Sequence, residues 1–190
     1  MIAYDEYNIE AVTGKALQEL GSITTNLLVY LRGKAGDEIL EPNFNEREIL
    51  HMRDVQVLFK YGFILKYIST IVSIVLIISF LIKGEKDILG RYIYKGLYIN
   101  WAIAGLLLVM IYFDFNKYFT YFHEIFFSND LWLLDPETDL LIQMLPEEFF
   151  IDMAKKIGLS FFQYVAIIQI IGYAIIEKGR VKDEKRFKLF

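Results

Sequence analysis

Apolar residues gather in three long runs along the chain, separated by polar segments. The runs read YISTIVSIVLIISFLI (67–82), GLYINWAIAGLLLVMIYF (96–113) and IGLSFFQYVAIIQIIGYAII (157–176). A helix needs about 20 predominantly apolar residues to cross a bilayer, and FKYGFILK extends the first run upstream. The pattern predicts spans at about 61–82, 96–113 and 157–176. Buried helices of a soluble protein are a poor alternative, because a chain of 190 residues leaves little to cover them.

The segment before the first run predicts a small subdomain outside the membrane, residues 1–44. SITTNLLVYLRG is typical of a short helix that begins at Ser22 or Thr24 and ends at Gly33. KAGDEILEPNF combines turn residues with short apolar pieces, which predicts a little β structure. Asn45 and Glu48 then have the spacing of a capping box, so we expect a helix to begin here and to run on into the first span.

The segment between the second and third runs, residues 114–156, combines aromatic residues with proline-based helix starts. DFNKYFTYFHEIFF is rich in the side chains that settle at lipid headgroups. Pro136 and Pro146 each suit the first position of a helix. We expect an interfacial loop around Trp132, a short helix, and re-entry into the third span.

The distribution of charge predicts the orientation of these spans. Loop 83–95 has four basic residues against two acidic ones, and 177–190 has six against three, whereas 114–156 has nine acidic and three basic residues. By the positive-inside rule the loop and the basic tail, 179–190, are cytoplasmic, and 114–156 lies outside with the N-terminal segment. Three spans then leave the N-terminus outside without a signal sequence, so we expect a preceding helix to be missing, or the first span to translocate the segment.

Composition narrows the chemistry. The chain is 55% hydrophobic and 16% aromatic and contains no cysteine, which excludes thiol catalysis, disulfides and cysteine-bound zinc. The net charge of −4 predicts no class of partner, and no motif binds phosphate, a dinucleotide or nucleic acid.

Two histidines are the candidate functional residues. His51 shares a helix face with Asp54, whose carboxylate is positioned to accept an imidazole proton and fix the tautomer. An incidental histidine on a solvated helix is the alternative. His123 stands in TYFHEIFFSND, and both histidines are predicted at the outer membrane boundary. We expect neighbouring polar residues to support them: Asp54, Arg53, Glu124 and Asn129.

The standard catalytic motifs are absent. His123-Glu124 does not continue as HExxH, and no G-x-S-x-G elbow exists. A metal held by both histidines with Glu124 or Asp54, and Ser128 as an unorthodox nucleophile, stay open. Histidine acid–base chemistry at a lipid interface remains as the leading interpretation. Four phenylalanines around His123 suit either a lipid groove or helix packing: Phe119, Phe122, Phe126 and Phe127.

FNEREILHMRDVQVLF and FHEIFFSNDLWLLDPETDLLIQMLPEEFF, with the spans around them, resemble the lipoprotein intramolecular transacylase family (Lit) of Gram-positive bacteria. The resemblance covers about residues 40–176. It implies a mainly α, polytopic membrane helix bundle with a small extracellular subdomain that contains short β structure. Members also have an N-terminal span that this sequence lacks.

The resemblance also implies a reaction in the cell membrane. An acyl chain moves from the sn-2 position of the diacylglyceryl group to the α-amino group of a lipoprotein's N-terminal cysteine, which gives a lyso-form lipoprotein. The family's two catalytic histidines correspond to His51 and His123, on the extracellular face, and no metal or other cofactor is implied. The expected partners are a diacylated lipoprotein substrate and membrane lipid, and the oligomeric state is not predicted. A metal-dependent membrane hydrolase and a non-catalytic membrane adaptor are the alternatives.

Overall fold

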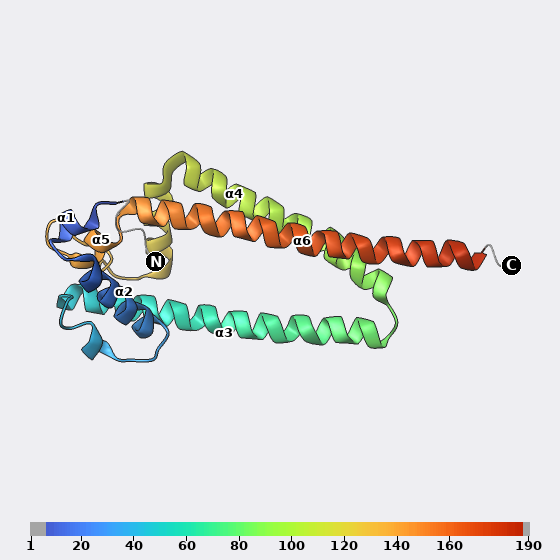
Figure 1. Cartoon of the computed structure of the whole chain (residues 1–190), viewed down its shortest axis with the longest axis horizontal. Coiled ribbons are helices and arrows are strands. Elements are labelled where there is room, and N and C mark those ends of the chain that lie inside the picture. The colour runs from blue at the N-terminus through green and yellow to red at the C-terminus, as the bar shows by residue number, and fades with distance from the viewer. Residues whose placement is uncertain (1–6, 188–190) are drawn as a thin grey trace. The chain divides into compact units, whose positions relative to one another are not determined.

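The computed structural model describes residues 7–187, with side chains up to Arg180, and is built from helices joined by short segments (Figure 1). Over residues 7–187 there is no strand, so the fold is mainly α as predicted, and the expected short β structure is not found. In chain order the elements are α1 (Ile9–Thr13), α2 (Leu17–Leu31), the 3-10 helix η1 (Asp37–Ile39), α3 (Glu46–Ile82), α4 (Lys86–Phe126), α5 (Leu140–Met144) and α6 (Glu147–Phe187).

Three helices, α3, α4 and α6, are long and apolar enough to cross a membrane. Their most apolar windows of 18 residues have mean hydropathies of 2.3, 1.9 and 1.9, and only 0%, 0% and 11% of these windows is buried inside the protein. Helices suit this environment because they satisfy their backbone hydrogen bonds internally, and lipid accepts the outward-facing apolar side chains. The three predicted spans therefore fall on three separate helices.

The chain divides into two compact units. Unit 1 comprises residues up to 66 together with 114–152, and unit 2 comprises residues 67–113 together with those from 153 onward. Each long helix contributes one part to each unit. The two histidines belong to unit 1.

The start of α3 confirms the predicted capping box. The backbone N–H of Asn45 donates to Glu48 Oε2 at 2.7 Å, and the backbone N–H of Glu48 donates to Asn45 Oδ1 at 3.0 Å. The reciprocal pair satisfies two donors that a helix N-terminus otherwise leaves free. From this cap α3 runs through Gly62 to Ile82 as one helix, as the sequence predicted.

Unit 1 has a packed apolar core to which α1, α2, α3, α5 and the segment before α3 contribute. Its buried members are Ile9, Leu20, Ile23, Leu27, Tyr30, Leu40, Phe44, Met52, Leu140, Leu141 and Met144. Leu40 is fully buried although it lies in an irregular segment. The segment after α2 is therefore fixed by its side chains rather than by strand pairing.

Three details of unit 1 correct the predictions. Local bonds, such as Leu40 N–H to Asp37 O at 2.8 Å, satisfy the backbone where β structure was expected, so η1 forms instead. The helix expected from Ser22 or Thr24 begins earlier, at Leu17, and its C-terminal end confirms Gly33, whose φ of 67° suits glycine. The residues after Pro136 form a turn, and the helix begins only at Leu140.

Unit 2 brings α4 and α6 together at glycines. A Cβ on Gly90 would lie 2.9 Å from the backbone oxygen of Gly172, so the two backbones are in direct contact there. Further along, Trp101 Nε1 donates to Gln169 Oε1 at 2.8 Å, and Gln169 Nε2 donates to Tyr94 O at 3.0 Å. Small residues and side-chain hydrogen bonds are the usual means by which helices associate in lipid, where hydrophobic burial gives little driving force.

The helix α4 is interrupted at Asp114. This residue has φ −162° and ψ 80°, outside the helical region, and its Oδ1 accepts the backbone N–H of Lys117 at 3.1 Å. Asp114 therefore serves as an N-cap for the second part of α4, which carries His123. The interruption falls where the second predicted span ends and the aromatic segment begins.

Candidate active site

The two histidines lie side by side in unit 1. His51 is in the second turn of α3, His123 is in the last turn of α4, and each is only 7% exposed. Their ring centroids are 6.1 Å apart, with the ring planes tilted by 35°. Two residues separated by 72 positions in the sequence thus lie close together.

Aromatic rings enclose the pair. Phe127 contacts both imidazoles, with centroids 5.3 Å from His51 and 5.5 Å from His123. Phe119 packs edge-on against His123 at 4.4 Å, and Trp132 stacks on the same imidazole at 4.9 Å. Of the four predicted phenylalanines, Phe126 instead packs on Phe122 and is 53% exposed.

The hydrogen bond of His123 defines its tautomer. Its Nδ1 lies 2.7 Å from the backbone oxygen of Phe119, one helical turn earlier. A carbonyl oxygen only accepts hydrogen bonds, so Nδ1 carries the proton and donates it. The second nitrogen, Nε2, is left with a lone pair that can accept a proton.

His51 is oriented by packing rather than by a carboxylate. Its Nδ1 is buried and has no hydrogen-bond partner among the described residues. Asp54, expected to accept the imidazole proton, instead accepts Asn129 Nδ2 at 2.8 Å on its Oδ2. Asp54 thus bonds to the side-chain amide of Asn129, whereas the sequence predicted a bond to the imidazole of His51.

Two contacts hold the segment after α4 against α3, one to a residue before His51 and one to a residue after it. One is the bond from Asn129 to Asp54, and the other joins Arg47 Nη2 to the backbone oxygen of Asp130. The same segment is stiffened by Trp132, whose Nε1 donates to Asn129 O at 3.0 Å. These contacts fix the ring of Trp132 over His123.

A buried polar cluster ties α3 to the segment before α5. Glu48, 1% exposed, accepts the backbone N–H of Leu141 at 2.6 Å in addition to that of Asn45. Asp139 accepts Asn45 Nδ2 at 2.8 Å and the backbone N–H of Asp135 at 2.7 Å. Burial raises the pKa of Glu48, and the backbone N–H groups of Leu141 and Asn45 oppose that rise. The cluster sets the first turn of α3, one turn ahead of His51.

The remaining predicted residues lie elsewhere. Arg53 Nε donates to Asp37 Oδ2 at 2.7 Å, and Tyr30 hydroxyl donates to Asp37 Oδ1 at 2.9 Å, so Arg53 binds the loop after α2 rather than a histidine. Glu124 is exposed and forms no hydrogen bond or ion pair with the residues that the structure describes. Among those residues no group of three His, Asp or Glu side chains is placed to hold a metal ion.

Burial keeps both imidazoles neutral. It lowers the pKa of His51 to about 4, repulsion by His123 adds to this effect, and Asp54 opposes it. Burial also lowers the pKa of His123, against the opposing effect of the Phe119 carbonyl. At neutral pH both side chains are therefore available to accept a proton, and neither begins as an imidazolium.

Comparison with known proteins shows the family of the chain. The sequence profile of the lipoprotein intramolecular transacylase family Lit matches residues 1–150. The chain belongs to the Lit family. The solved structure of the membrane-integral lipoprotein intramolecular transacylase Lit from Bacillus cereus matches it with a TM-score of 0.83 and 25% sequence identity, over 94% of this chain and 82% of that one. A search of curated proteins found no match.

Membership of the Lit family makes this protein an acyltransferase that spans the membrane several times and acts on lipoproteins. Three residues that build the site were given no role in it from the sequence: Trp132, Glu48 as a bridge to α5, and Arg47. The only sequence signal for Glu48 was its capping-box spacing, which does not reveal the bond to Leu141. Trp132 lacked any signal beyond its place in an aromatic loop.

Proposed function

We propose that this Lit protein transfers an acyl chain within one lipoprotein molecule, from the sn-2 oxygen of the diacylglyceryl group to the α-amino group of the N-terminal cysteine. The observation that carries the proposal is the pair of buried imidazoles with centroids 6.1 Å apart inside an aromatic enclosure. Ester and amine belong to one substrate, so holding them together gains effective concentration. No enzyme nucleophile is then needed, in keeping with a chain that has no cysteine.

His123 is assigned as the base and His51 as the hydrogen-bond donor. Nε2 of His123 accepts a proton from the attacking amine, while the amine nitrogen bonds to the ester carbonyl carbon. The single N–H of neutral His51 stabilises the oxyanion that forms. The bond from carbon to the sn-2 oxygen then breaks, and the proton on His123 passes to that oxygen. The histidines return to their starting state, and the proton balance is zero.

The aromatic enclosure suits an acyl ester. Phe119, Phe127 and Trp132 surround His123 with apolar surface, which excludes water that would otherwise compete with the amine. Transfer rather than hydrolysis is the expected outcome of such an environment.

The orientation of the site belongs to the same proposal. The basic loop 83–95 and the tail 179–190 are assigned to the cytoplasm, and residues 1–44 and 114–156 to the extracellular side. The membrane domain then comprises 45–178, and lipoproteins reach the histidines from the outer leaflet.

The test is a reaction of a synthetic diacylated lipopeptide with the full chain in detergent. Substrate and product are isomers of equal mass, so an intact mass does not distinguish them. Tandem mass spectrometry is expected to find the acyl chain on the N-terminal nitrogen, and an amine-reactive reagent is expected to label substrate but not product. A product lighter by one acyl chain, with a free amine, would instead show a hydrolase, and an unchanged lipopeptide would favour a non-catalytic adaptor.

A further inference from the structure

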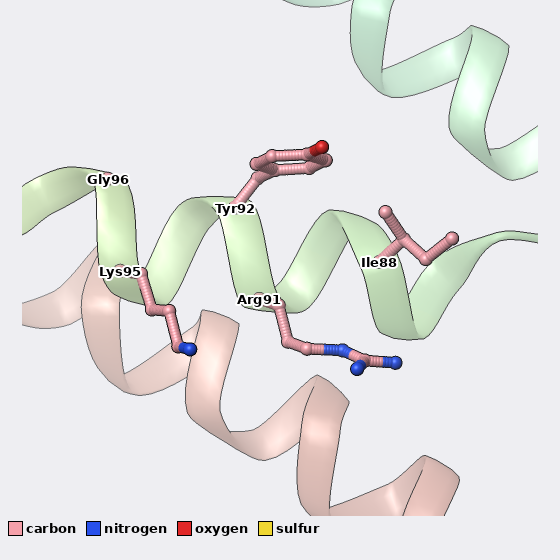
Figure 2. A pocket seen from close by; sticks show the side chains of 5 residues that line it. All are labelled: Ile88, Arg91, Tyr92, Lys95 and Gly96. Atoms are coloured by element: carbon pink, nitrogen blue, oxygen red, sulfur yellow. The ribbon is translucent and has the colours of Figure 1, made fainter.

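Unit 2 contains a groove that the proposed transfer reaction does not use. It lies along the first turns of α4 and has a volume of about 630 Å³. Its lining residues are Ile88, Arg91, Tyr92, Lys95 and Gly96 (Figure 2). It begins where the polar loop after α3 ends, and it reaches the first residue of the predicted second span, Gly96.

The groove carries two cations that act together. Arg91 and Lys95 are four positions apart and therefore share one face of α4. Figure 2 shows both side chains leaving the helix on the same side, with their charged ends pointing back toward Ile88, near the start of α4. Side chains of a helix lean toward its N-terminus, so the charges are carried away from the apolar run and toward the membrane boundary.

Neither cation is paired with a carboxylate among the residues whose side chains the structure describes. The guanidinium Nε of Arg91 is 3.4 Å from the backbone oxygen of Asp87, a weak contact within the helix. Two close positive charges at an apolar boundary favour an anionic ligand.

The other wall of the groove, formed by Tyr92 and Ile88, is apolar except for the tyrosine hydroxyl. Tyr92 is 66% exposed, its ring lies 5.9 Å from that of Phe80, and Ile88 is also exposed. Tyrosine is typical of the headgroup region, where its ring contacts acyl chains and its hydroxyl contacts water. A ligand that matches both walls has a negative head joined to an apolar tail.

We propose that this groove binds an anionic phospholipid. Its headgroup phosphate pairs with Arg91 and Lys95, and its glycerol and upper acyl chain lie along Ile88, Tyr92 and Gly96. The proposal does not depend on the chemistry assigned to the histidines, because every residue that carries it lies in unit 2.

The experiment is native mass spectrometry of the full chain in detergent, titrated with phosphatidylglycerol or with phosphatidylcholine of the same acyl chains. Phosphatidylglycerol is expected to bind more tightly. The double variant Arg91→Gln/Lys95→Gln is expected to lose roughly 30-fold in phosphatidylglycerol affinity, about fivefold for each basic side chain near a membrane surface. Lys83→Gln/Lys86→Gln removes the same charge from the loop before α4 and the first residue of α4, outside the groove lining, and is expected to lose much less.

A second pair of variants changes space and leaves charge intact. A Cβ on Gly96 meets nothing within 4 Å, and Gly96 lines the groove, so Gly96→Leu adds bulk at an open position of the lining. Gly105 on the same helix is equally open and does not line the groove, which makes Gly105→Leu its control. Only Gly96→Leu is expected to weaken phosphatidylglycerol binding. If the two charge variants lost the same phosphatidylglycerol affinity, or if Gly96→Leu bound the lipid fully, general surface electrostatics would account for binding. Either result would overturn the proposal that the groove is the binding site. The glycine pair decides the matter if either charge variant fails to insert.

Discussion

The two units of this protein differ in the kinds of residue that they bury. Unit 1 encloses large apolar side chains together with four polar ones that are at most 7% exposed: Glu48, His51, His123 and Asp139. In unit 2 the large apolar side chains mostly face outward, and the buried places go to Gly90 and Gly172 alongside Leu89 and Val165. One unit is assembled by hydrophobic burial, and the other by close backbone contact in lipid.

The difference is in keeping with the assignment of the proposed chemistry to unit 1. A buried charge or polar group is tolerated where hydrogen-bond donors surround it, and unit 1 supplies them through the backbone of Asn45, Asp135 and Leu141. These donors hold the carboxylates of Glu48 and Asp139, whereas the imidazoles are oriented by aromatic packing and, for His123, by its bond to the Phe119 carbonyl. Among the described residues of unit 2 no polar or charged side chain is buried.

The largest effect is expected at the histidines of unit 1. His123→Ala should slow acyl transfer by about 10²–10⁴-fold, the usual contribution of a general base, and His51→Ala by about 10²–10³-fold, the usual contribution of an oxyanion donor. The rate is measured with the diacylated lipopeptide as the fraction of amine blocked over time. No acyl group should remain on the protein, since the substrate amine is the nucleophile.

Because both rings are buried, their removal also disturbs packing, and a control must separate the two effects. Phe127→Leu removes a ring that contacts both imidazoles but transfers no proton. It should lower the melting temperature of the protein as much as the histidine variants do, while slowing transfer less than about tenfold. If Phe127→Leu were as inactive as the histidine variants, packing rather than proton transfer would account for their loss. An acyl chain found on Ser128 would contradict direct transfer.

The next effect concerns the pH at which the histidines titrate. The chain has two histidines, so NMR of protein labelled only at histidine resolves both, and His51→Ala assigns them. The His51 midpoint is expected near 4 and that of His123 below its ordinary value of 6.5, because burial lowers both pKa values. Between pH 6.5 and these midpoints the unfolded chain binds more protons, so folding stability is complete above pH 6.5 and falls as the pH falls. A midpoint at 6.5 for either would mean that the site is open to water.

The buried carboxylate of unit 1 should matter next. Glu48→Ala leaves the backbone N–H groups of Asn45 and Leu141 without their acceptor, at a cost of about 1–3 kcal/mol for a buried unsatisfied donor. Glu46→Ala, on the same first turn but exposed, is the matched control and should change stability by less than about 0.5 kcal/mol. Denaturant melts followed by circular dichroism measure both. Equal stability of the two variants would mean that the cluster of Glu48 and Asp139 does not fix α3.

Unit 2 should respond to space rather than to lost polar contacts. Gly90→Ala places a Cβ 2.9 Å from the backbone oxygen of Gly172, so α4 and α6 must separate, at a cost of about 1–3 kcal/mol. Gly105→Ala has nothing within 4 Å and should gain up to about 1 kcal/mol from helix propensity. Opposite shifts in melting temperature are the expected result. If both variants shifted the melting temperature in the same direction, the close contact between Gly90 and Gly172 would not be what holds unit 2 together.

The apolar pattern predicted unit 2 more completely than unit 1. Three apolar runs lead directly to three helices, because a span needs only length and composition. In unit 1 the capping box of Asn45 and Glu48 was predictable because both partners are local. The β structure expected before it was wrong, since short apolar pieces with turn residues fit a 3-10 helix as well as a hairpin.

The candidate site was predictable as a pair of histidines and not as a geometry. Sequence placed His51 and His123 on one side of the membrane, but their separation depends on contacts such as Asn129 with Asp54, across 75 positions. Local spacing favoured Asp54 as the partner of His51 because the two share a helix face. Local spacing does not reveal that the amide of Asn129, far away in the sequence, bonds to the carboxylate of Asp54.

The smallest effect tests the polar link inside unit 2. Gln169 joins α6 to α4 through Trp101 Nε1 and the Tyr94 carbonyl, at 2.8 Å and 3.0 Å. Gln169→Leu removes both bonds, yet each interhelical hydrogen bond in lipid contributes only about 0.6 kcal/mol on average, and the leucine restores apolar contact. Only a small fall in melting temperature is expected, with a wavelength shift in Trp101 fluorescence, read in a Trp132→Phe background that leaves one tryptophan. A loss as large as that of Gly90→Ala would mean that unit 2, like unit 1, depends on a buried polar cluster, and the contrast between the units would fail.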